Sequence, residues 1–237
     1  MSNRQQKQSL TLRLDLSCKR PFPPLEGLNT THSKTLQIQL VSSFAANFPL
    51  QTYQNTLSAE LLFLYKHLPI GTLQELMDIF STYLLTDAQG IMQAERLQFS
   101  SLEVNFADHS WKIAADEIEI QKETNEFGSV DIIYEQDAYG IYRLLIAPNK
   151  QIPPHFHKQM DEIELILGND LLLQNKKVKA GLCVHWPKNF LHTYQNTSNK
   201  TQLVLCIDKP KFIPQDEIKD YNGLIKDLDQ IYSEFIW

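Results

Sequence analysis

The chain has 237 residues and a net charge of −6 from 22 basic and 28 acidic side chains. This length accommodates one large domain or two small ones. Without a basic patch or a stretch of interleaved arginine and aromatic residues, we expect no nucleic-acid partner. No apolar run approaches the ~20 residues that a membrane-spanning helix needs, so we expect no membrane partner either.

The cysteines and the first residues of the chain predict the compartment. The three cysteines, Cys18, Cys183 and Cys206, are an odd number without paired spacing. That pattern is typical of a reducing environment with buried thiols. Residues 1–9 are polar and lack the hydrophobic segment of a signal peptide. We therefore expect a cytoplasmic protein.

Residues 9–121 show the pattern of an α+β domain. Apolar and polar residues alternate as in strands over 10–16, 34–44, 97–106 and 111–120, and apolar residues recur at helical spacing over 57–68 and 72–84. The order strand, strand, helix, helix, strand, strand predicts an antiparallel sheet with two helices on one face.

The second helical stretch begins Thr72-Leu73-Gln74-Glu75-Leu76. Together with the ββααββ order, it resembles the tunnelling fold of pterin-handling enzymes, and dihydroneopterin aldolase in particular. The resemblance implies that Glu75 anchors a pterin ring, because a carboxylate accepts two hydrogen bonds from it. Glu75 also fits a capping box with Thr72, and both roles stay open. The family's catalytic lysine is missing from the region of Phe106 and Ala107, which puts aldolase chemistry in doubt.

Beyond this domain, the sequence predicts three further segments: a linker, a barrel and a terminal helix. The polar segment 122–128 breaks the pattern and is interpreted as a linker. Residues 129–215 show short strands and turns of an all-β barrel. Residues 216–237 carry apolar residues at helical spacing, with Asp216 as the cap of a predicted terminal helix.

Within the predicted barrel, residues 153–196 combine histidines and carboxylates at regular distances. His155 and His157 project to one side of a strand, because side chains two apart share a face. Glu162 and Glu164 share a face of the next strand, so either could join them. His192 follows on a later strand. Three imidazoles and one carboxylate suit Zn, Fe, Mn, Ni or Co, and leave room for water or substrate on the metal.

These spacings resemble the two motifs of the cupin family. The first reads His155-x-His157, four residues, Glu162, five residues, Gly168, and the second reads Gly181, five residues, Pro187-Lys188-Asn189, two residues, His192, three residues, Asn196. One residue is missing between Glu162 and Gly168. Asn189 replaces the usual glycine, and asparagine is the residue that next best adopts a positive φ. The resemblance implies a divalent metal on His155, His157, Glu162 and His192.

We therefore expect a two-domain small-molecule metalloenzyme linked to pterin or folate metabolism. Tyr142, Trp186 and Tyr194 are candidates for the lining of the barrel pocket, and the catalytic residues are not assigned. Iron would favour dioxygenase chemistry, whereas Zn or Mn would favour isomerisation or hydrolysis. Two alternatives stay open: a non-catalytic metal- or ligand-sensing cupin with a degenerate pterin-binding domain, and an active aldolase with a structural cupin. Apolar sheet edges predict a homo-oligomer.

Overall fold

The structure is a computed structural model. It describes residues 8–12, 16–17, 35–37, 99–106, 109–114, 121–231 and 233–235, with single residues between 60 and 83. The chain divides into two compact units: residues 1–65 with 69–119, and residues 66–68 with 120–237. Among the residues described, no helix is both long enough and apolar enough to cross a membrane.

The first unit contains a small mixed sheet. Its strands are β1 (Gln8–Leu12), β2 (Leu16–Ser17), β3 (Thr35–Gln37), β4 (Phe99–Phe106) and β5 (His109–Ala114). Strand β4 pairs antiparallel with β3 and β5 but parallel with β1. The expectation of a wholly antiparallel sheet is therefore wrong for this pair. A parallel neighbour needs a long crossover connection, and the segment between β1 and β4 is long enough to supply it.

The described residues within the predicted helices 57–68 and 72–84 are largely helical. Leu61, Leu64, Ile79 and Phe80 are fully buried, as expected for core-facing positions. The tunnelling fold as a whole involves residues outside those described and stays a prediction.

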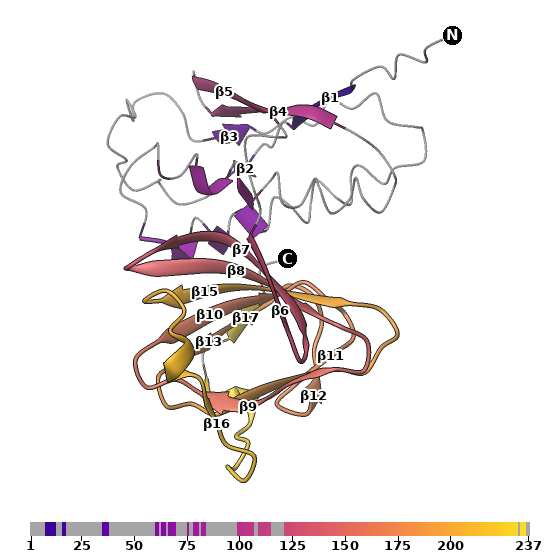
Figure 1. Cartoon of the computed structure of the whole chain (residues 1–237), viewed down its shortest axis with the longest axis vertical. Helices are drawn as coiled ribbons and strands as arrows, with labels where there is room; N and C mark the ends of the chain where they lie inside the picture. The colour runs from indigo at the N-terminus through magenta and orange to yellow at the C-terminus, as the bar shows by residue number, and fades with distance from the viewer. Residues whose placement is uncertain are drawn as a thin grey trace. The chain divides into compact units, whose positions relative to one another are not determined.

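The second unit consists of two facing antiparallel sheets (Figure 1). One has seven strands in the order β17-β13-β10-β15-β8-β7-β6, and the other has five in the order β12-β11-β14-β9-β16. The strands are β6 (Gln121–Asn125), β7 (Gly128–Gln136), β8 (Tyr139–Ile146), β9 (Gln151–Phe156), β10 (Asp161–Ile166), β11 (Leu171–Leu173), β12 (Lys176–Lys177), β13 (Leu182–Trp186), β14 (His192–Asn196), β15 (Gln202–Lys209), β16 (Ile218–Lys219) and β17 (Ser233–Phe235).

Apolar side chains from both sheets form the core of this unit. They include Ile146, Ile152, Ile166, Leu171, Leu173, Val178, Leu182, Val184, Trp186, Tyr194 and Val204. The turns follow the sequence prediction at Asn189, whose φ is 64°. Asn196, at the end of the second motif, is fully buried and donates side-chain hydrogen bonds to the carbonyls of Ile146, Ala147 and Lys200. It therefore ties three backbone segments together.

The predicted linker 122–128 is wrong. Residues 121–125 form β6, which pairs with β7, and the Asn125 carboxamide accepts hydrogen bonds from the backbone N–H groups of Phe127 and Gly128 at 3.2 and 3.1 Å. The segment has a polar sequence because all five side chains of β6 are exposed at the end of the sheet. Such an edge strand needs no apolar face.

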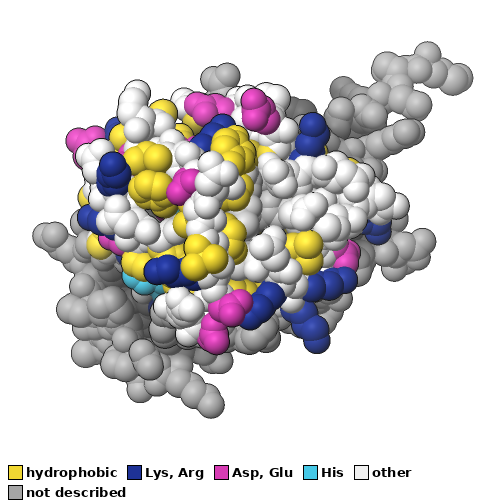
Figure 2. Space-filling view, turned by 90° about the horizontal axis from the view of Figure 1, so that it is seen from below, with side chains coloured by type: hydrophobic (Ala, Val, Ile, Leu, Met, Phe, Trp, Pro, Cys, Tyr) yellow, Lys and Arg dark blue, Asp and Glu magenta, His cyan; other side chains and the backbone are white. Residues whose placement is uncertain are grey.

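The predicted terminal helix 216–237 is also wrong. A 3₁₀ turn, Pro214–Asp216, leads into this segment, and a second one, Leu228–Gln230, lies within it. The segment also contains the short strands β16 and β17, which pair antiparallel with β9 and β13. Backbone pairing with these strands overrides the local helical spacing. The predicted helix would have carried Tyr221 and Leu224 on its apolar face. In the structure their side chains are 67% and 83% exposed. Figure 2 shows apolar side chains interspersed with both charges on the face it views.

Candidate metal centre

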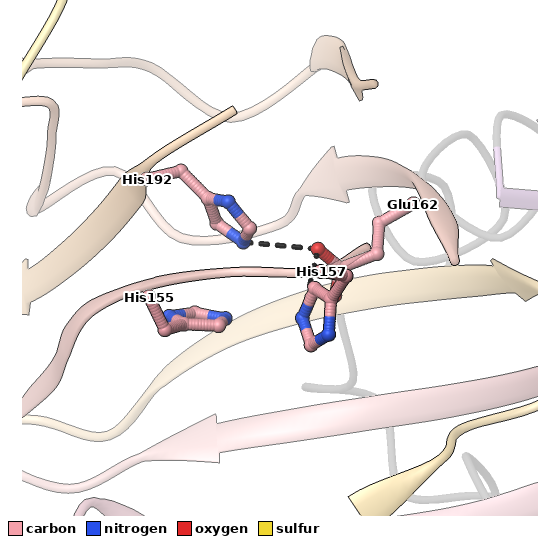
Figure 3. A group of neighbouring side chains, drawn as sticks. All are labelled: His155, His157, Glu162 and His192. Atoms are coloured by element: carbon pink, nitrogen blue, oxygen red, sulfur yellow. Dashed lines mark ion pairs between the residues drawn. The ribbon is translucent and has the colours of Figure 1, made fainter. Parts of the chain in front are cut away.

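Four predicted ligand residues converge inside the second unit (Figure 3). His155 lies on β9 and His157 just beyond its end, while Glu162 lies on β10 and His192 begins β14. One donor atom from each residue lies within 4.8 Å of the others, and all four side chains are buried. Residues from three strands therefore meet at one point.

The inward atoms of this group lie at ion-pair distance from one another and, among the described residues, make no hydrogen bonds. Glu162 Oε2 lies 3.0 Å from His192 Nε2 and 3.4 Å from His157 Nε2. Within the described part of the chain, these three atoms and His157 Nδ1 are buried without a hydrogen-bond partner. Buried polar atoms without partners cost folding free energy unless a ligand satisfies them. Their convergence fits a metal ion.

Local backbone contacts orient two of the imidazoles. His155 Nδ1 lies 2.9 Å from the carbonyl of Pro153, and His192 Nδ1 lies 3.0 Å from the carbonyl of Phe190. A ring that donates its Nδ1–H to a carbonyl keeps the Nε2 lone pair free for a metal. Each carbonyl lies two residues before its histidine, so the chain next to each ligand sets the ring orientation.

The electrostatics favour the protonation states that metal binding needs at His155 and Glu162, but not at His192. Burial lowers the pKa of His155 to about 3, which keeps the imidazole neutral. Burial raises the pKa of Glu162, but the neighbouring rings of His192 and His157 outweigh it and bring the pKa to about 2. Burial lowers the pKa of His192, yet the Glu162 carboxylate prevails and raises it. Metal binding would displace the proton that this ion pair favours on His192.

A distant carboxylate braces the turn between His157 and Glu162. The buried Asp216 accepts hydrogen bonds from the backbone N–H groups of Lys158, Gln159 and Met160 at 3.1, 2.8 and 3.2 Å. Burial raises the pKa of Asp216, but these N–H groups outweigh it and lower the pKa below its usual value. Asp216 thus caps this turn instead of the helix predicted from the sequence.

Glu164 lies beside the ligand group but outside it. Its carboxylate accepts hydrogen bonds from Trp186 Nε1 and the Tyr194 hydroxyl. The Trp186 ring stacks on His192, with ring centroids 4.7 Å apart and planes within 10°. Burial and the nearby Glu162 charge raise the pKa of Glu164 to about 7. Of the two carboxylates left open by the sequence, Glu162 is the one that joins the histidines.

A cavity of about 630 Å³ adjoins this group, and His155, His157 and Glu162 line it. Tyr142 and Tyr194 line it as well. Trp186 is not among the lining residues; its ring stacks on His192 and its indole N–H donates a hydrogen bond to Glu164.

Two further lining residues were missed from the sequence. Cys206 and Asp208 on β15 face the cavity, and the Cys206 thiol donates a hydrogen bond to Asp208 at 2.9 Å. They lie opposite Glu164 and Glu162 in the β10–β15 pairing. The alternation of strand 202–209 is the signal that places both on one face, but only the pairing register sets that face beside Glu162.

Glu75, the predicted pterin anchor, lies in the first unit. It is helical and partly buried. Its role toward a pterin stays a prediction.

Comparisons with known proteins find likenesses at the level of solved structures. A scan against protein-family models and a search of curated proteins found no match. KdgF from Halomonas sp. is 15% identical with a TM-score of 0.36, covering 42% of this chain and 93% of its own. A cupin-superfamily sugar phosphate isomerase from Silicibacter pomeroyi is 15% identical with a TM-score of 0.34, covering 42% and 75%. An oxalate decarboxylase from Bacillus subtilis is 11% identical with a TM-score of 0.37, covering 43% and 30%.

These neighbours cover the C-terminal part of the chain, and they include cupin and double-stranded β-helix proteins. The two facing antiparallel sheets described above are consistent with a cupin β-barrel in the second unit. None of the neighbours supports the dihydroneopterin aldolase resemblance of the first unit, which still rests on the sequence alone.

Proposed function

We propose that the second unit binds one divalent metal ion through His155, His157, Glu162 and His192 and acts on a small molecule held in the adjoining cavity. The observation that carries this proposal is the convergence, on the cavity wall, of buried donor atoms that make no hydrogen bonds among the described residues. A purely structural role for the same four residues would leave these atoms with the ion pairs of Glu162 to His157 and His192 alone, and buried polar atoms in folded proteins are normally hydrogen-bonded.

The donor set defines the chemistry that a bound ion would supply. Three neutral imidazoles and one carboxylate suit Zn, Fe, Mn or Ni and leave coordination positions for a substrate oxygen. Such an ion polarises a carbonyl or hydroxyl, and iron would add dioxygen chemistry. The metal therefore decides between an isomerase or hydrolase and a dioxygenase.

Residues of the chain itself position the ligand. The Tyr142 hydroxyl donates to Glu135 at 2.6 Å and accepts the Phe212 backbone N–H at 2.9 Å, which holds the phenol ring in the cavity wall. Asp208 and Cys206 face the cavity next to Glu162 and lie within reach of a ligand at the metal. A barrel that binds a ligand without turnover would use the same site, and activity measurements on the metal-loaded protein distinguish the two.

Metal content is the direct test. The full chain is purified without a histidine tag or chelator, and its metals are measured by mass spectrometry beside the double variant His155→Ala/His157→Ala. We expect close to one ion per chain, lost in the double variant. His185→Ala is the matched control, because His185 lies on β13 outside the ligand group. Equal metal in the double variant, or none after reconstitution with Zn, Mn, Fe or Ni, would refute the proposal.

The link to pterin or folate metabolism is a separate proposal that rests on the sequence of the first unit. Its test is binding of a pterin to the full chain beside Glu75→Ala. Metal content does not bear on it, so the two proposals stand or fall independently.

A further inference from the structure

The cavity beside the metal centre has a mouth formed by two sheet edges. Strands β6 and β16 are the terminal strands of the two sheets, and both contribute to the lining. On β6, the lining residues are Gln121, Glu123 and Asn125, every second position of an exposed strand. Glu217 and Lys219 line the cavity from the other edge and are also solvent-accessible. A ligand would therefore enter between these two edges.

The charges of the described lining are mostly negative. Glu123 and Glu217 lie at the mouth and Glu135 further along the wall. The one basic residue among the described lining residues is Lys219, and its Nζ lies 4.0 Å from Glu217 Oε1. These carboxylates would therefore repel an anionic ligand group, because the lysine beside them is already paired with Glu217.

An apolar wall connects the metal centre to this acidic region. The centroid of the Phe212 ring lies 6.5 Å from that of His157 and 6.4 Å from that of Tyr142. The Tyr142 hydroxyl in turn donates a hydrogen bond to Glu135. Val130 and Leu144, which pair across β7 and β8, line the same cavity. The lining thus passes from metal ligands, over apolar and aromatic surface, to carboxylates.

We propose that the cavity takes a ligand with an oxygen-bearing head at the metal, an apolar body and a cationic amine at the mouth. This inference rests on the proposed metal centre and adds the class of ligand. An ammonium group at the mouth is attracted by Glu123, Glu135 and Glu217, and an aromatic face such as that of Phe212 also attracts cations. A carboxylate in the same place is repelled by all three.

Three matched hydroxamates test the inference on the metal-loaded full chain. They share a metal-binding hydroxamate head and a hexanoyl body, and end in an amine, a methyl group or a carboxylate. Calorimetric titration gives the three dissociation constants. We expect the amine to bind about tenfold more tightly than the methyl compound, and the carboxylate about tenfold more weakly, as two to three nearby charges at a partly exposed site would produce.

Variants at the mouth show whether these carboxylates cause the order. The double variant Glu123→Gln/Glu217→Gln should reduce the preference for the amine over the carboxylate by about tenfold, whereas Lys219→Gln should increase it. The control Glu126→Gln/Asp229→Asn changes the net charge equally at exposed positions outside the lining, and should leave the preference unchanged.

The outcomes separate this inference from the proposed function. Three equal affinities, or an equal shift in the control variant, would overturn the amine inference and leave the metal centre standing. If no hydroxamate binds to a chain that mass spectrometry shows to be metal-loaded, the inference is overturned and the metal centre stands; a chain that takes up no metal overturns the proposed function instead.

Discussion

Glu162 and Glu164 lie two residues apart on the same face of β10, and both are buried, but their carboxylates have different neighbours. Glu162 Oε2 faces histidine rings and lacks a hydrogen-bond partner among the described residues. Glu164 accepts hydrogen bonds from Trp186 and Tyr194. One carboxylate is kept available for a ligand, and the other is used by the protein.

The same contrast extends from the ligand group to its surroundings. Asp216, like Glu164, has its carboxylate satisfied by the protein, through three backbone N–H groups. Interactions already made within the protein contribute to folding stability, whereas unsatisfied donors gain free energy only when an ion binds. Substitutions in the ligand group should therefore change metal affinity, and substitutions around it should change stability.

Glu162→Gln should have the largest effect. Loss of the charged ligand should weaken metal binding on the order of a thousandfold, about 4 kcal/mol. The metal-free protein should also lose some stability, because the amide cannot form the ion pair that the carboxylate makes with His192 at 3.0 Å. Competition with a chelating dye measures the affinity, and thermal unfolding in EDTA measures the stability.

Glu164→Gln is the matched control for that substitution. It makes the same substitution on the same strand face, and its metal affinity should stay within about tenfold of the wild-type value, the range for residues that act behind the ligands. Equal losses of affinity in the two variants would contradict the distinction between the two carboxylates.

Asp216→Ala should destabilise the protein by about 3 kcal/mol, because three backbone N–H groups lose a charged acceptor. The loss should be the same with and without metal, as expected for a brace that is complete in the folded chain. Urea unfolding measures it, with the exposed Asp229→Ala as the control. A loss confined to the metal-loaded protein would show that Asp216 acts through the ligands instead.

The stability that Asp216 contributes should depend on pH in a defined direction. Its pKa in the folded protein is lowered from the ordinary 3.8, so the folded state favours the ionised form. The contribution is fully present above the unfolded pKa and is lost as pH falls through the folded pKa. In EDTA, the difference in unfolding free energy between wild type and Asp216→Asn should be constant above about pH 5 and shrink below about pH 4. A difference that grows on acidification would contradict the assignment.

Trp186→Phe should have the smallest effect. It removes the hydrogen bond to Glu164 but keeps an aromatic ring against His192, so we expect a loss of about 1 to 2 kcal/mol in stability and less than tenfold in metal affinity. Trp186→Leu, which also removes the ring, should cost more in both. Chemical unfolding and dye competition give the two values, and identical losses in the two variants would argue against the stacking contact.

Local patterns in the sequence predicted much of the barrel and its candidate site. The short strands and turns over 129–215 predicted an all-β barrel, and the structure has strands there. The spacing of His155, His157, Glu162 and His192 identified the residues that the structure brings together. These predictions succeeded because strand alternation and turn propensity depend on neighbouring residues.

The helical spacing at the C-terminal end gave a wrong prediction, because it too depends only on neighbouring residues. Residues 216–237 satisfy a helical pattern locally, but their backbone pairs with β9 and β13 at the edges of two sheets. Likewise, residues 121–125 show no apolar alternation because their strand is exposed. Pairing with distant strands decided the C-terminal segment, and pairing with the neighbouring strand β7 decided residues 121–125.

By itself, the sequence determined which residue types could form a metal centre and which strands would carry them. The tertiary structure alone decided that Glu164 is held by Trp186 and Tyr194, that Trp186 packs behind His192, and that Asp216 braces a turn 56–58 residues earlier in the chain. These features depend on strand register and on contacts between distant residues. A one-residue shift in register would turn each side chain to the other face, and no local pattern specifies that register.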